Sequence, residues 1–231
     1  MSAVEWAPEA EPQSREEAER APGCPEVVAA AKERGITSIV HFTRSRSGLV
    51  GILDRSAVKA RRFLARDLRL RHVYRENAPD RSRDLPWHGY VNLSVSAINV
   101  HMFRYSKRWH PGEDWVILEF KPRILGHRGV VFSTTNNAYS VAHRATGLQG
   151  FEQMFSPVVP WGRKGSERIR SAHAPHETTD PQAEVLYPFE LSLEHLRRVI
   201  VPDDDVKDAV KAARAHFRHA PKIKKDPEAF R

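Results

Sequence analysis

Two hydrophobic periods run along this chain, and together they predict a mixture of strands and helices. Alternating apolar positions and clusters of β-branched residues predict strands at residues 36–42, 90–95, 115–120, 130–132, 183–189 and 197–201. Apolar positions three or four residues apart predict helices at residues 25–34, 45–53, 98–109, 147–155 and 204–217. Strands and helices do not alternate regularly, which favours an α+β fold with a mainly antiparallel or mixed sheet.

Four segments lack a regular pattern. Residues 1–24 are rich in Glu, Ala and Pro and are expected to form a poorly ordered acidic leader. The arginine-rich residues 57–83 are expected to be a partly helical surface segment, and the polar residues 157–181 a long loop of functional importance. Residues 220–231 are expected to be a charged tail, which leaves one domain at residues 25–219.

The composition suits a globular protein of 231 residues, with 40% hydrophobic and 29% charged residues. No apolar run approaches the length that crosses a bilayer, and the first residues do not have the pattern of a signal peptide. Cys24 is the only cysteine, which excludes an internal disulfide and any zinc site with two thiolates. We therefore expect a cytoplasmic protein.

Positive charge is concentrated in the body of the chain. Residues 1–26 hold seven acidic and two basic residues, a net charge of −5; because the whole chain carries +8, the remainder carries +13. This indicates a polyanionic partner, although a merely basic soluble protein has the same composition. The arginines of residues 61–83, interleaved with Phe63 and Tyr74, favour nucleic acid, because such segments grip phosphates and stack on bases.

Common nucleotide and metal motifs are absent from the sequence. It contains neither a dinucleotide-binding glycine motif nor a P-loop, so a nucleotide must be held in another way. The closest histidine pairs, His173/His176 and His216/His219, lack a nearby carboxylate and third histidine, so no metal site is expected. The turn at residues 162–166 could cradle a phosphate through its amides and two cations, or be an ordinary solvated turn.

Four polar segments interrupt the apolar pattern and could form one site. An imidazole and a hydroxyl at a strand end can bind a ribose, and serines alternating along a strand present hydroxyls on one face. Glu184 begins an apolar strand directly after the long loop; taken alone, it is better explained as a strand-edge glutamate that discourages aggregation. The four segments are residues 41–43, 90–103, 133–140 and 180–187.

In this order, the segments resemble the DarT family of bacterial DNA ADP-ribosyltransferase toxins. The resemblance covers residues 36–201 and is carried by His41-Phe42-Thr43, Asn92-Leu93-Ser94-Val95-Ser96 with Asn99 and Met102-Phe103, residues 115–120, and Gln182-Ala183-Glu184-Val185-Leu186. It implies the ADP-ribosyltransferase fold, a split β-sandwich with a central NAD cleft and peripheral helices. NAD is then the co-substrate, without a metal.

The resemblance also implies roles for individual residues. Glu184 matches the catalytic glutamate and Arg83 the functional arginine, with Arg81 the alternative position. The long loop occupies the place of the family's substrate-recognition loop. The expected NAD-binding residues are His41, Phe42, Thr43, Tyr90, Ser94, Ser96 and Phe103; the expected substrate-binding residues are Gln182, Arg81, Arg163 and Lys164.

These residue types suit the chemistry. Cleavage of the nicotinamide–ribose bond builds positive charge on the ribose, which a carboxylate stabilises, and an arginine can hold the diphosphate. A base must be unstacked to react, which favours single-stranded DNA. In several related ADP-ribosyltransferases that act on guanine, a Gln or Glu two residues before the glutamate recognises the acceptor, so the resemblance implies guanine over thymine as acceptor here. We expect a monomeric toxin whose partner is a macrodomain or another ADP-ribosyl hydrolase antitoxin.

Three alternatives stay open at this point. The acceptor could be RNA or protein, or the enzyme could be an RNA 2′-phosphotransferase, which has a related fold and uses basic residues. A non-enzymatic basic module would bind nucleic acid in a salt-dependent way and would not be stabilised by NAD.

Overall fold

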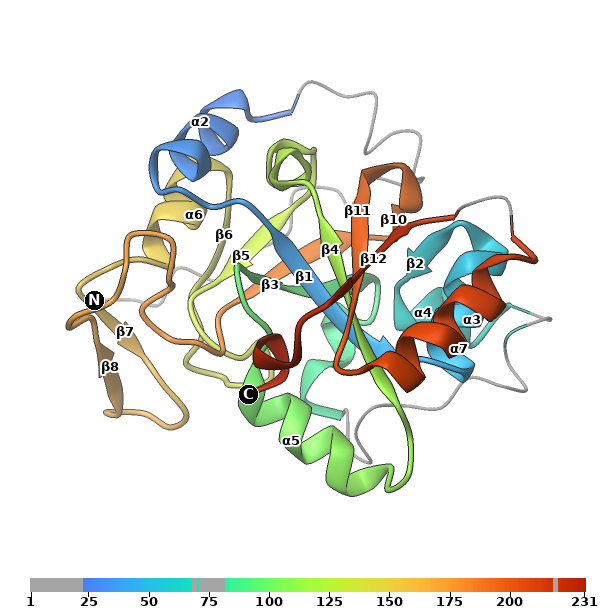
Figure 1. The fold of residues 1–231 in the computed structure, drawn as a ribbon. Helices are drawn as coiled ribbons and strands as arrows, with labels where there is room; N and C mark the ends of the chain where they lie inside the picture. The colour runs from blue at the N-terminus through green and yellow to red at the C-terminus, as the bar shows by residue number, and fades with distance from the viewer. Residues whose placement is uncertain (1–22, 68–69, 71–81, 218–219) are drawn as a thin grey trace.

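The computed structural model describes residues 23–67, 70, 82–217 and 220–231. These residues form an α+β fold in which helices surround a long central sheet (Figure 1). The strands are β1 (Ile39–Arg44), β2 (Ala57–Lys59), β3 (Tyr90–Val95), β4 (Trp115–Phe120), β5 (Val131–Ser133), β6 (Arg144–Thr146), β7 (Val158–Pro160), β8 (Glu167–Ile169), β9 (Glu184–Pro188), β10 (Glu190–Ser192), β11 (Leu196–Val201) and β12 (Lys222–Lys225).

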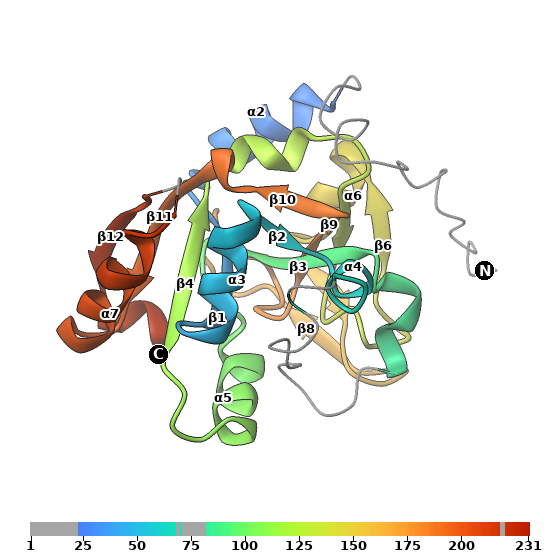
Figure 2. The ribbon, with the colours of Figure 1, turned by 90° about the vertical axis from the view of Figure 1, so that its right-hand side faces the viewer.

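Six α-helices and four 3₁₀ helices occur in the described residues. The α-helices are α2 (Pro25–Glu33), α3 (Ser47–Arg55), α4 (Arg61–Leu64), α5 (Val100–Trp109), α6 (Gly147–Gln153) and α7 (Asp204–Arg214). The 3₁₀ helices are η1 (Ser82–Trp87), η2 (Pro122–Gly126), η3 (Leu193–His195) and η4 (Pro227–Phe230). Figure 2 shows α3 and α4 beside β1 and β3, with α5 below them. No described helix has the length and hydropathy needed to cross a membrane.

The central sheet is split between two of its strands. Its order is β12-β11-β4-β1-β3-β9-β5-β6, and all its pairs are antiparallel except β11 with β12. β1 pairs with β4 along its whole length, but with β3 only at Ile39↔Val95 and Val40↔Ser94. Beyond Val40 the two strands separate, so the sheet divides into two halves joined at one end.

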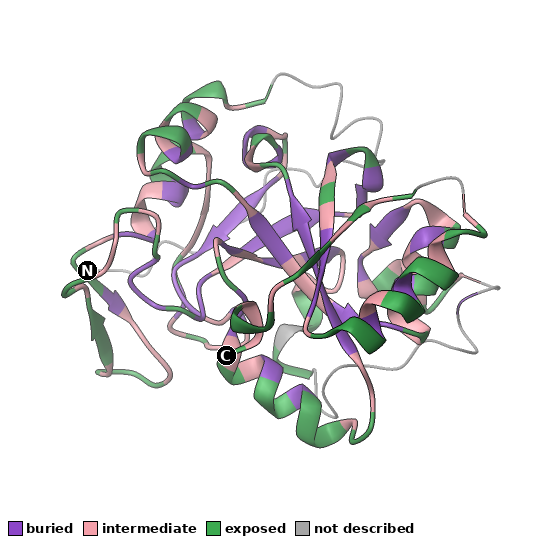
Figure 3. Ribbon diagram, in the orientation of Figure 1, coloured by how far each residue is buried: buried purple, intermediate pink, exposed green. Residues whose placement is uncertain are grey.

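Two apolar cores cover the two faces of β1 and β4 (Figure 3). Because successive strand residues point to opposite faces, Ile39 joins the larger core and Val40 the smaller one. All six residues of β4 are buried, including Glu119, whose carboxylate accepts hydrogen bonds from Arg198 at 2.7 and 2.9 Å. Burial on both faces explains why this strand is a nearly continuous apolar run.

The predicted α+β fold is confirmed, and the strands at residues 90–95 and 115–120 have the predicted bounds. Three segments differ from expectation, since each contains strands that the sequence pattern did not predict: β2 and β12 pair with strands distant in the sequence, and β7 and β8 pair with each other in a local hairpin. The arginine-rich segment contains β2 and α4, and the long loop contains the β7–β8 hairpin. The expected tail contributes β12, which pairs with β11, and η4, whose Phe230 packs 5.8 Å from Phe103. The predicted leader lies almost entirely outside the described residues.

Candidate active site

A cavity of about 450 Å³ opens where β1 and β3 separate. This volume lies in the range of small-molecule binding sites. β1 and α3 form one wall, β2 and α4 another, and β3 with the start of α5 a third. The polar residues that line it include His41, Thr43, Arg44, Arg61, Arg83, Tyr90, Asn92, Ser94, Asn99, Tyr105, Asn136 and Glu184.

Glu184 is fixed in this cavity by two hydrogen bonds to one carboxylate oxygen. Its Oε2 accepts from the side-chain Nδ2 of Asn92 at 3.2 Å and from the backbone N–H of Asn137 at 2.9 Å. Glu184 begins β9, where the long preceding segment enters the sheet. It pairs with Ser133 of β5, and the residues that follow it pair with β3 as well. The carboxylate is therefore oriented before any ligand binds, as electrostatic catalysis requires.

Arg144 holds the loop that supplies the Asn137 donor. Its guanidinium donates to Asn137 Oδ1 at 2.6 Å and to the carbonyl oxygens of Asn137, Tyr139 and Ala142 at 2.6, 2.9 and 3.0 Å. Burial lowers the pKa of Arg144, and the charge of Glu184 partly offsets this effect. An arginine stays protonated at neutral pH regardless. Arg144 thus stabilises the loop and places positive charge near the carboxylate.

His41 faces the same part of the cavity from the other half of the sheet. Its Nδ1 lies 2.9 Å from the backbone oxygen of Asn92, and because a carbonyl only accepts, Nδ1 carries the proton. Burial lowers the pKa of His41, and this hydrogen bond partly offsets the effect. The neutral imidazole therefore presents Nε2 as an acceptor. Asn92 connects His41 and Glu184 across the split, through its backbone and side chain respectively.

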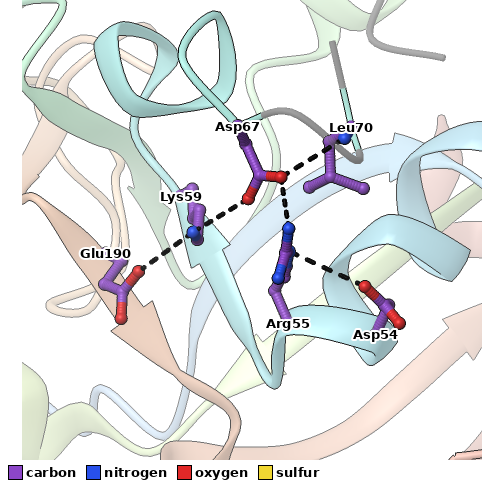
Figure 4. Close-up of polar contacts among 6 residues, drawn as sticks. All are labelled: Asp54, Arg55, Lys59, Asp67, Leu70 and Glu190. Carbon is purple, nitrogen blue, oxygen red and sulfur yellow. Dashed lines mark hydrogen bonds and ion pairs between the residues drawn. The ribbon is translucent and has the colours of Figure 1, made fainter. Parts of the chain in front are cut away.

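Cations on the α4 side of the cavity are partly neutralised (Figure 4). Asp67, whose side chain is only 5% exposed, forms ion pairs with Arg55 and with Lys59 Nζ, the latter at 3.1 Å. Glu190 lies 3.9 Å from the same ammonium. Lys59 lines the cavity but its charge is balanced by these carboxylates, whereas Arg83 lines it without an ion pair to any residue that the structure describes.

The comparison with protein families decides the assignment. A family model described as "ssDNA thymidine ADP-ribosyltransferase, DarT" matches residues 40–231. The chain belongs to the DarT family. The predicted enzyme class, a DNA ADP-ribosyltransferase, is thereby confirmed. A search of curated proteins finds no match.

Solved DarT structures share this fold. Thermus sp. 2.9 DarT in complex with NAD+ has a TM-score of 0.58 at 17% identity over 84% of this chain and 98% of that one. The same protein in complex with ADP-ribosylated ssDNA has a TM-score of 0.60 at 17% identity, over 85% and 97%. Thermosipho africanus DarTG in complex with ADP-ribose has a TM-score of 0.52 at 13% identity, and this chain covers 51% of it.

Seven of the predicted DarT site residues line the cavity: Glu184, Arg83, His41, Phe42, Thr43, Tyr90 and Ser94. The structure does not bring five others to its walls. Phe103 is 2% exposed within the smaller core, because the helical period places it on the inner face of α5 beside Ser106. The Ser96 hydroxyl, in a turn with φ of 63°, donates to the carbonyl oxygen of His176 at 3.2 Å.

The remaining predicted substrate-binding residues lie around the segment before β9. Gln182 is 6% exposed, and its backbone N–H donates to Asp180 Oδ1 at 3.1 Å. Arg163 and Lys164 are exposed in the turn between β7 and β8. Arg81 lies outside the described residues. Among those that the structure describes, no group of three or more His, Cys, Asp or Glu side chains could hold a metal ion.

Sequence reasoning missed four residues that shape this DarT site. Asn92 stands within the motif that carries the resemblance, and Asn137 within the polar run at residues 133–140, so the sequence pattern could have indicated both. Arg144 had none, because its role depends on a loop that folds back on it. Gly48 had no signal either, because its role depends on how closely helix α3 approaches Thr43 of β1.

Thr43 and Gly48 pack together so closely that a larger residue at Gly48 displaces the Thr43 hydroxyl. A Cβ at Gly48 would lie 2.0 Å from Thr43 Oγ1, too close for the two atoms to keep their places. We expect Gly48→Ala to weaken NAD binding about tenfold, because displaced contacts at the cavity wall cost about 1.4 kcal/mol of binding free energy. Isothermal titration calorimetry with NAD measures this; Val50→Ala, at an exposed position of the same helix that does not line the cavity, is the control and should bind NAD like the wild type.

The depressed pKa of His41 predicts a loss of stability in acid. The unfolded chain takes up a proton at His41 at a higher pH than the folded chain. The contribution of neutral His41 to the stability of the fold is therefore complete above the ordinary histidine pKa of about 6.5, and it is lost as pH falls below that value. A loss of 1 kcal/mol of stability shifts the Tm of a domain this size by about 2–4 °C.

Thermal melts from pH 7.5 to pH 5 measure this effect. The wild type should lose several degrees more than His41→Gln over this interval, because the variant retains a donor but cannot be protonated. His216→Gln, at an exposed position after α7, is the control for a histidine lost from the surface. Parallel curves for the wild type and His41→Gln would contradict the prediction.

Proposed function

We propose that this DarT-family enzyme transfers ADP-ribose from NAD to a thymine base of single-stranded DNA, with Glu184 as the catalytic carboxylate. The observation that carries the proposal is the fixed orientation of Glu184 by Asn92 and Asn137 in a cavity of suitable volume. The Thermus relative of the same fold is bound to NAD+ in one structure and to ADP-ribosylated ssDNA in another, which supports NAD as donor and DNA as acceptor.

The cavity residues suit a ribose-centred displacement. The bond between nicotinamide nitrogen and ribose C1′ breaks with its electrons leaving on neutral nicotinamide, and a base nitrogen bonds to C1′ and releases its proton to solvent water. Positive charge develops on the ribose in between, where Glu184 stabilises it by charge and by hydrogen bonds to ribose hydroxyls. His41 Nε2 accepts from a further hydroxyl, and Arg83, exposed at the rim, holds the diphosphate.

Thymine replaces guanine as the preferred acceptor in this proposal. The family description names thymidine. The expectation of guanine rested on Gln182, which is buried and does not line the cavity, and it is not confirmed. The guanine alternative is tested together with thymine by the experiment below.

Mass spectrometry of oligonucleotides after reaction with NAD tests the proposal. Homopolymers of each of the four deoxynucleotides are incubated with the protein and NAD, and the DNA is digested to locate the adduct. A mass gain of one ADP-ribose on oligo-dT alone is expected. A gain on oligo-dG alone would assign guanine, and no gain on any DNA, from a protein whose Tm rises with NAD, would overturn the proposal.

We further propose a toxin role with a partner that removes or blocks the modification. The Thermosipho relative is named DarTG, and this chain covers 51% of it. This supports a second activity, such as a macrodomain, supplied by another polypeptide or another part of a longer one. Growth arrest of cells on expression of the wild type, and normal growth with Glu184→Gln, would support the role; equal growth would contradict it.

A further inference from the structure

The outward face of α5 continues the cavity mouth onto the surface. Met102 and Tyr105 line the cavity. His101, Tyr105 and Trp109 follow one another at intervals of four residues, so their rings share one stripe of the helix. Tyr105 is 39% and Trp109 50% exposed, which is unusual for large aromatic side chains. The stripe therefore leads away from the cavity along about two turns of helix.

Two exposed cations flank this stripe. Arg104 and Arg108 are exposed, at positions that neighbour the aromatic rings in the next helical row. Neither forms an ion pair with a residue that the structure describes, and α5 itself contains no acidic residue. By contrast, Lys207 and Lys211 of α7 each pair with an aspartate on their own helix, at 3.3 and 2.8 Å. The charge of α5 is therefore available to a partner.

The buried side of α5 makes it a rigid platform. Asn99 caps its start by accepting a hydrogen bond from the backbone N–H of Met102 at 3.0 Å. The ring of Phe103 packs edge-on against Phe42 at 5.4 Å and against Trp115 at 5.7 Å. A fixed helix that displays exposed rings beside exposed arginines has the features of a binding surface for unstacked bases and phosphates.

We propose that α5 is the track along which single-stranded DNA passes the active site, with bases stacked on Tyr105 and Trp109 and phosphates paired with Arg104 and Arg108. The inference rests on the proposed function, because it requires that the base in the cavity belong to a DNA strand. Duplex DNA fits poorly, since its bases are already stacked and cannot reach the rings. The DNA strand runs along the stripe from Tyr105 at the cavity to Trp109.

Fluorescence anisotropy with a labelled oligo-dT tests the phosphate contacts. Arg104→Gln/Arg108→Gln should weaken binding about tenfold at low salt and reduce the slope of log affinity against log salt by about 1.4, the value for two released counterions on a single strand. Lys207→Gln/Lys211→Gln removes the same charge from another exposed helix and is the matched control. Equal losses in the two double variants would overturn the proposal.

The stacking contact has its own variant. Trp109→Ala should weaken binding by about 5-fold to 100-fold with an unchanged salt slope, the usual effect of losing one stacked base. Leu148→Ala, which removes a 40% exposed apolar side chain from α6, should bind like the wild type. Wild-type affinity in Trp109→Ala would contradict the proposal.

The readouts separate this inference from the proposed function. All α5 variants should retain the wild-type Tm increase with NAD, because the NAD contacts proposed above come from β1, η1 and β9. If the wild type neither binds nor modifies oligo-dT, both proposals fall. If it binds and modifies the DNA and the α5 variants do so equally well, only the track along α5 is wrong.

Discussion

Glu184→Gln is expected to lower the rate of ADP-ribose transfer by about 10²-fold to 10³-fold, the effect of removing one oriented group that stabilises transition-state charge. The amide oxygen of glutamine can still accept from Asn92 Nδ2 and from the Asn137 N–H, so the geometry is preserved and only the charge is lost. Glu184→Ala should abolish detectable transfer while leaving the fold intact.

Single-turnover assays on oligo-dT measure the rate, and the Tm increase with NAD reports binding. The rate should fall in Glu184→Gln with little change in the NAD dependence of Tm, because the carboxylate acts mainly in the transition state. Glu152→Gln, which removes a carboxylate paired with Arg34 away from the cavity, is the matched control and should keep full activity. Retained activity in Glu184→Gln would remove this residue from its catalytic role.

Arg144→Ala is expected to lower kcat about 10-fold to 100-fold, although its side chain is not among the residues that line the cavity. Its four hydrogen bonds hold the loop whose Asn137 N–H orients Glu184. Hydrogen bonds from charged groups contribute about 1.5–3 kcal/mol each, a loss large enough to release the loop. The acid limb of the pH–rate profile should also move to higher pH, because a carboxylate with fewer donors holds its proton more tightly.

Chemical rescue distinguishes this positioning role from general destabilisation. Free guanidinium at low millimolar concentration should restore part of the lost kcat in Arg144→Ala, while Arg144→Lys should recover little, because an ammonium cannot reproduce the fork of donors. Arg34→Ala removes a partly buried arginine that pairs with Glu152, so it should lower Tm without changing kcat. A kcat in Arg144→Ala equal to that of the wild type would refute the positioning role.

Local patterns determined much of the fold. The alternation at residues 90–95 and the apolar run at 115–120 predict β3 and β4 with their observed bounds, because strand burial repeats every two residues. The helix at residues 204–217 is observed as α7, three residues shorter, and begins where Asp203 Oδ1 accepts from the Val206 N–H at 2.8 Å. The family could likewise be inferred from short motifs in the correct order, and the family model confirms it.

The sequence by itself determined elements such as β3, β4 and α7, the enzyme class, and seven residues that line the cavity. Only the tertiary structure decided that β1 and β3 separate after two residue pairs, and that Asn92 then connects His41 with Glu184. It also decided that Arg144 supports the carboxylate and that the C-terminal residues add β12 to the sheet. These features depend on contacts between residues far apart in the chain, which the periodicity of neighbouring residues does not encode.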